Sequence, residues 1–172
     1  YDVYRMTTGM GKSMQELLAA SVELNVVDGV ILPNLKMQGT KEACAYLDEK
    51  GRCSIHPYRP GICRLFPLGR YYENGGFSYF LQTGECAKEN RSKIKVSKWI
   101  DTPDLTRNQQ FTLQWHDLLH AMEERLTGED EGKQQEENLL LLRLFYLLPY
   151  KGTTDFYSQF TERMEYWNEQ IR

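Results

Sequence analysis

Apolar residues in the second half of the chain recur every three to four positions, a spacing that predicts amphipathic helices. The first helix is expected up to about residue 126, because Thr102-Pro103 is a start signal and Gly128 a stop signal. A second is expected over 134–148, where leucines dominate up to Pro149, and a third over 156–171. The apolar positions of the first and third helices are Trp115, Leu118, Leu119, Met122, Leu126, Phe156, Phe160, Met164, Trp167 and Ile171.

The first sixty residues predict shorter elements. Residues 2–8 favour a short helix, and Ser13 followed by Glu16 is a capping-box pattern that opens another helix over 14–20. Residues 29–37 are apolar, with β-branched Val30 and Ile31 before Pro33, which indicates a strand or an extended stretch.

A β-hairpin is the clearest strand signal. Residues 69–73 and 77–83 flank Asn74-Gly75-Gly76, which tolerate the positive φ of a tight turn. Short hairpins followed by long helices predict an α+β fold, with a hairpin-rich half packed against C-terminal helices.

Composition sets the outer bounds. A chain of 172 residues that is 41% hydrophobic can bury one sizeable core, so we expect a single domain with a metal-binding half over 1–90 and a helical half over 91–172. The net charge is −3 and both signs are spread along the chain, which argues against nucleic acid as a partner. The longest apolar run, over 139–148, is too short to span a bilayer.

All four cysteines lie in one segment, at Cys44, Cys53, Cys63 and Cys86, with 8, 9 and 22 residues between them. Two interpretations are open: a secreted disulfide framework, or reduced thiolates that hold a metal in the cytoplasm. Disulfides compensate for a small core, whereas this chain has long apolar helices. We therefore expect metal ligands and a cytoplasmic protein.

The local sequence supports this interpretation. Asp48 to Gly51 form a turn signal, so Cys44 and Cys53 are expected on paired short strands. The segment around Cys63 places Arg59 and Arg64 beside the sulfur, and positive charge favours thiolate over thiol.

These residues carry a family resemblance. The matching positions are Cys44, Leu47, Gly51, Cys53, Ile55, Tyr58, Arg59, Pro60, Cys63, Arg64, Phe66 and Pro67. The segment resembles the YkgJ-type cysteine-cluster proteins, a zinc- or iron-chelating family, and the resemblance implies metal binding. The family's upstream C-x-x-C-C-like knot is absent here, so we expect the natural protein to extend before Tyr1 and to contribute further thiolates.

The sequence leaves two kinds of metal centre open for the cysteine segment, a structural zinc and an iron–sulfur cluster. Structural zinc sites usually pair cysteines as C-x-x-C, which this chain lacks. Iron–sulfur clusters, including 4Fe–4S clusters, tolerate separated cysteines, so we favour iron–sulfur over zinc. Tyr58, Arg59 and Arg64 are expected around the centre, and His56 is expected there chiefly in a structural role.

Enzymatic activity is left open. No glycine-rich nucleotide motif follows a strand, and His116 and His120 lack the glutamate of H-E-x-x-H. The cysteine segment also resembles that of flagellin lysine N-methylases, which implies a protein substrate or partner by likeness alone. The alternatives are therefore a metal-cluster protein with a redox or protein-modifying role, and a structural zinc module that mediates protein interaction.

Overall fold

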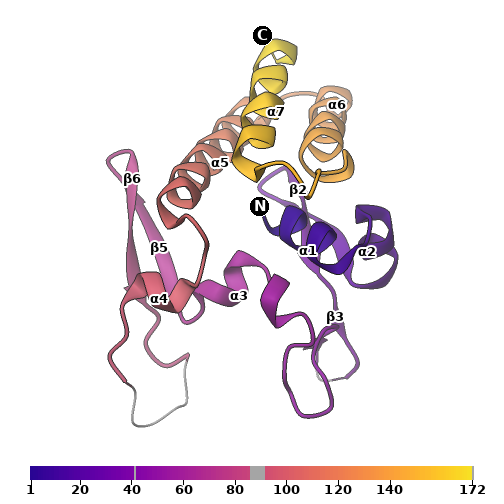
Figure 1. Ribbon diagram of the computed structural model, residues 1–172. Coiled ribbons are helices and arrows are strands. Elements are labelled where there is room, and N and C mark those ends of the chain that lie inside the picture. The colour runs from indigo at the N-terminus through magenta and orange to yellow at the C-terminus, as the bar shows by residue number, and fades with distance from the viewer. Residues whose placement is uncertain (41, 86–91, 172) are drawn as a thin grey trace. The chain divides into compact units, whose positions relative to one another are not determined.

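The computed structural model describes residues 1–40, 42–85 and 92–171, and has an α+β fold (Figure 1). These residues form two compact units. The first unit comprises residues 1–59 and 119–172, and the second comprises residues 60–118. The expected single domain stays a prediction.

The first unit begins with two helices, α1 (Asp2–Met10) and α2 (Met14–Ala20). The predicted capping box is confirmed, because the Ser13 hydroxyl accepts the Glu16 N–H at 3.2 Å and the Glu16 carboxylate accepts the Ser13 N–H at 2.7 Å. Two backbone donors at the start of α2 are thereby satisfied.

Two short hairpins follow. Strands β1 (Val22–Val27) and β2 (Val30–Leu35) pair antiparallel around Asp28 and Gly29, whose φ angles are 51° and 80°. The side chain of Asn138 holds this turn, accepting the Ile31 N–H at 2.6 Å and donating to the Gly29 carbonyl at 3.0 Å. The second hairpin pairs β3 (Met37–Gln38) with β4 (Ala43–Cys44).

The predicted C-terminal helices are present as α5 (Leu105–Leu126), α6 (Glu131–Leu142) and α7 (Phe156–Gln170). The expected helix over 134–148 changes its winding near its end, because Arg143–Leu147 form a π-helical turn, η2. The Leu148 N–H donates to the Arg143 carbonyl at 2.8 Å, a bond that spans five residues instead of four.

The core of the first unit has two described parts. Around α1 and α2, buried side chains form one cluster, namely Met6, Met14, Leu17, Val22 and Ile55. In α6, η2 and α7, Leu141, Phe145, Phe160 and Trp167 are almost fully enclosed, and the Phe145 and Trp167 rings meet edge to face at 6.0 Å. Apolar burial of this kind is the main source of folding free energy.

The second unit contains α3 (Gly61–Leu65), the hairpin β5 (Leu68–Glu73) and β6 (Gly76–Leu81), and α4 (Val96–Ile100). The predicted hairpin is confirmed, with Glu73 opposite Gly76 and positive φ at Asn74 and Gly75. Figure 1 shows β5 and β6 as an extended ribbon ending at this turn. Because both turn residues have positive φ, the connection has the twist that suits a two-residue hairpin.

Among the described residues, no helix combines the length and the apolar composition that crossing a membrane requires.

Candidate metal-binding segment

Cys44 and Cys53 lie on one loop of the first unit, residues 44–54, called the cysteine loop below. Cys44 is paired with Met37 across the β3–β4 hairpin, and its carbonyl accepts the Leu47 N–H at 3.0 Å. Leu47 in turn forms an antiparallel bridge with Cys53. Both cysteines are half-buried and neither forms a disulfide.

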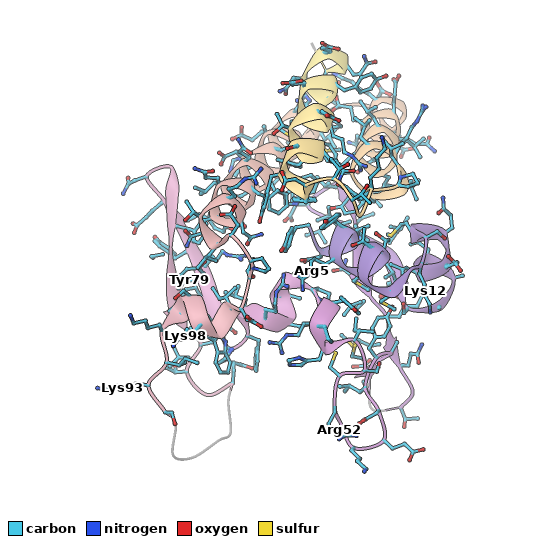
Figure 2. All side chains as sticks on the ribbon, viewed as in Figure 1. Arg5, Lys12, Arg52, Tyr79, Lys93 and Lys98 are labelled. Carbon is cyan, nitrogen blue, oxygen red and sulfur yellow. The ribbon has the colours of Figure 1, made fainter. Side chains whose placement is uncertain are left out.

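The carboxylate of Asp48 holds the turn between these two cysteines. It accepts the backbone N–H groups of Lys50 and Arg52 at 2.9 and 2.8 Å, and the Arg52 Nε–H at 3.0 Å. Arg52, at the turn, is labelled in Figure 2. The backbone N–H of Arg52 is the main cause that lowers the pKa of Asp48 below its ordinary value of 3.8.

The turn over residues 48–51 is as predicted, but the expectation that Cys44 and Cys53 lie on two strands paired with each other is wrong, because β4, which carries Cys44, pairs with β3, and Cys53 is bridged to Leu47. A turn at these positions closes first between Asp48 and Arg52 and then between Leu47 and Cys53. The partner of Cys44 would have to lie near residue 56, where His56–Tyr58 form a 3-10 turn, η1. The pairing continues as far as Ser54, whose N–H donates to the Tyr46 carbonyl, and ends before His56, where η1 begins.

The far side of the cysteine loop is anchored to the core of the first unit. Cys53 and Tyr46 pack against the α1–α2 cluster. The Tyr46 carbonyl accepts both the backbone N–H and the hydroxyl of Ser54, at 2.8 and 2.9 Å. The Tyr46 hydroxyl lies 2.5 Å from the hydroxyl of Ser21. The chain's own hydrogen bonds and core contacts therefore hold this loop.

Turn η1 also rests on α1. The ring of Tyr58 covers Gly9 so closely that a β-carbon at position 9 would overlap ring atoms. Arg5 donates to the Pro57 carbonyl at 2.5 Å. His56 is exposed and Arg59 is half-buried. The expected places of His56, Tyr58 and Arg59 around a metal stay predictions, and the structure gives Tyr58 a packing role that sequence patterns did not reveal.

Cys63 lies in the second unit, on α3, and is exposed. The next residue, Arg64, is only 4% exposed, so the two side chains leave this short helix in different directions. Beyond α3, the Phe66 carbonyl accepts the indole N–H of Trp99 at 3.1 Å. Cys86 lies outside the described residues.

The described residues therefore bring two of the predicted ligands onto one loop. No group of three or more His, Cys, Asp or Glu side chains in the described ranges converges in a way that could hold a metal ion. The pair His116 and His120 is used differently, since each Nδ1 faces a carboxylate, Asp117 at 3.4 Å and Glu124 at 3.5 Å. A donor set of thiols suits zinc or iron–sulfur clusters and not the oxygen-seeking Mg²⁺ or Ca²⁺.

Cysteines clustered in the sequence, with no converging carboxylates in the described ranges, are typical of proteins that bind metal through thiolates. Residues 7–96, slightly more than half of the chain, match the CxxCxxCC family, described as a "Putative zinc- or iron-chelating domain". The chain belongs to this family, and the family resemblance of the cysteine segment is thereby confirmed. The run C-x-x-C-x-x-C-C itself does not occur in the 172 residues. Comparisons with curated proteins and with solved structures gave no match.

Proposed function

We propose that this protein binds an iron–sulfur cluster through Cys44, Cys53, Cys63 and Cys86. The observation that carries the proposal is the match to a zinc- or iron-chelating family over a range that includes all four cysteines. The position of Cys44 and Cys53 on one anchored loop supports it, since two ligands then need little ordering when metal binds. The absence of C-x-x-C pairs favours a cluster over a structural zinc.

Arg59 and Arg64 are proposed to stabilise the negative charge of a four-thiolate centre. Such a cluster, when bound, supplies one-electron transfer, so the function we propose is redox chemistry or the modification of a protein substrate. The chain's own contribution is to hold thiolates, to supply positive charge near them and to limit access of water.

The test is metal analysis of the full chain purified without oxygen. We expect iron and inorganic sulfide in stoichiometric amounts and visible absorption from thiolate–iron charge transfer. Single substitutions of each cysteine by serine should reduce the iron content strongly. Glu49→Ser is the matched control, because Glu49 is an exposed residue of the same loop and should leave the iron content unchanged.

The same metal analysis distinguishes the proposed iron–sulfur cluster from the alternative, a structural zinc module. Stoichiometric zinc without sulfide, lost in the same cysteine variants, would replace the cluster by a structural zinc module. Iron and zinc contents that do not respond to any of the cysteine substitutions would contradict metal binding by these residues.

A further inference from the structure

A basic segment in the second unit stands out against an acidic chain. Residues 92–100 read S-K-I-K-V-S-K-W-I, with Lys93, Lys95 and Lys98 and no acidic residue, whereas the whole chain has a net charge of −3. All three lysines are exposed. Figure 2 shows Lys98 on α4 and Lys93 on the segment before it, with the Lys93 side chain directed away from the ribbon.

Exposed apolar side chains accompany these lysines. Helix α4 packs against α3, and the indole N–H of Trp99 donates to the Phe66 carbonyl, which fixes the indole beside Phe66. Trp99 is 40% exposed, Phe66 46% and Ile94 54%. The exposed side chains of this region are called the lysine–tryptophan face below, and all of them belong to the second unit: Phe66, Lys93, Ile94, Lys95, Lys98 and Trp99.

The lysines of this face have no ion-pair partner among the described residues. Two acidic residues follow it in the sequence, Asp101 and Asp104. The Asp104 carboxylate accepts the Arg107 N–H at 3.3 Å and lies 3.8 Å from its guanidinium. Within the described ranges, no acidic side chain therefore neutralises the lysines of this face.

We propose that the lysine–tryptophan face binds an acidic segment of a partner protein. Lys95 immediately precedes α4, with φ and ψ of −66° and 137°, and Lys93 is two residues before it, so their Cα atoms are at most roughly 7 Å apart. Lys93 and Lys95 are thus close enough for one acidic peptide to present a carboxylate to each of them. Trp99, Phe66 and Ile94 provide the apolar contact that aromatic-rich interfaces use.

Other anionic partners fit this face less well. Interfacial membrane helices need a long apolar face, whereas α4 has five residues and Ile100 within it is buried, at 2% exposure. Nucleic acid needs more phosphate contacts than three lysines make. The proposal is independent of the metal, because no cysteine takes part in it.

The experiment measures binding of the full chain to a fluorescein-labelled peptide in which glutamate alternates with leucine. We expect salt-sensitive binding, and about tenfold or greater loss of affinity when Lys93→Glu, Lys95→Glu and Lys98→Glu are combined. The matched control combines Lys12→Glu, Lys50→Glu and Lys151→Glu, three exposed lysines elsewhere, and should keep affinity within about twofold. Replacing the three lysines of the face by glutamine repeats the test without charge reversal.

Three outcomes would overturn the proposal. The wild type could fail to bind the peptide, or the two triple variants could lose affinity equally. In a parallel titration, vesicles containing phosphatidylglycerol or a DNA duplex could bind more tightly than the peptide and depend on the same lysines, which would assign the face to lipid or nucleic acid.

Discussion

The two units differ in how much apolar surface they bury. Among the described residues, the buried apolar side chains of the second unit are Leu65, Ile100 and Leu118, and all the others belong to the first unit. Because apolar burial is the dominant favourable term in folding, we expect the first unit to supply most of the folding free energy and the second unit to depend more on other stabilisation.

The cysteines of the two units differ in how firmly the surrounding structure holds them. Cys44 and Cys53 sit on a loop that hydrogen bonds and core contacts already hold, whereas Cys63 is exposed on a five-residue helix. If the proposed cluster binds, it should therefore order the second unit more than the first. The predictions below test this contrast, from the largest effect to the smallest.

The core of the first unit should respond most strongly. Trp167 is 2% exposed and packs against Phe145, so Trp167→Ala should lower the free energy of unfolding by about 3–5 kcal/mol. Chemical denaturation followed by circular dichroism measures this value. The control is Tyr166→Ala, at a 48% exposed position of the same helix, with an expected change below about 0.5 kcal/mol. Equal losses in the two variants would mean that α7 is not packed as described.

Removal of the metal should act mainly on the second unit. A ligand present at about 100 times its Kd stabilises the folded state by roughly 2.7 kcal/mol, and this contribution disappears on chelation. Hydrogen exchange should then accelerate for the β5 and β6 amides, while the amides of α6 and α7 keep their protection. Uniform acceleration in both units would refute the contrast, and no change in either would separate the metal from the fold.

Much of this architecture was predictable because local signals and burial agree. The capping box, the hairpin at Asn74-Gly75 and the amphipathic helices each depend on residues close together in sequence. The strand or extended stretch expected over 29–37 contains β2, but strand β1 before it was not predicted, although Asp28-Gly29 is itself a hairpin signal. The π-helical turn at Arg143–Leu147 left no sequence signal, since leucines suit either winding.

The candidate site was predictable only in its composition. Clustered cysteines and the motif around Cys63 indicated the family, which the match over residues 7–96 confirms. The pairing around Cys53 depends on where η1 interrupts the strand, and the packing of Tyr58 on Gly9 joins residues far apart in sequence. Such contacts arise from tertiary structure, and hydrophobic periodicity does not encode them.

One glycine in each unit is covered by an aromatic ring, and the two should respond differently to alanine. At Gly9 the overlap involves Tyr58 atoms near the base of the ring, so the whole ring must move. Gly9→Ala should cost about 1–3 kcal/mol from overpacking, partly offset by up to about 1 kcal/mol of helix propensity. At Gly69 the overlap is with the far edge of the Phe80 ring, which is 48% exposed and can move. Gly69→Ala should cost less than about 1 kcal/mol.

Thermal denaturation measures both glycine variants. Gly152→Ala is the control, because the nearest atom to its new β-carbon would be Thr8 Cβ at an ordinary contact distance of 3.6 Å. A larger loss for Gly69→Ala than for Gly9→Ala would show that the second unit is packed more tightly than its few buried residues indicate.

The smallest effect should come from protonation of the cysteine loop. Because the Arg52 and Lys50 amides donate to the Asp48 carboxylate, the pKa of Asp48 is lower in the folded protein than in the unfolded chain. Its contribution to stability is therefore fully present above the ordinary value of 3.8 and is lost as pH falls through the lower folded pKa.

The amide resonances of Lys50 and Arg52 should titrate with a midpoint below 3.8, and Asp48→Asn should abolish this titration while Glu49→Gln leaves it unchanged. Since hydrogen bonds of the chain itself hold the loop, the midpoint should be the same before and after chelation. A midpoint at or above the ordinary value, or one that moves when metal is removed, would mean that the cysteine loop depends on metal as Cys63 is proposed to do.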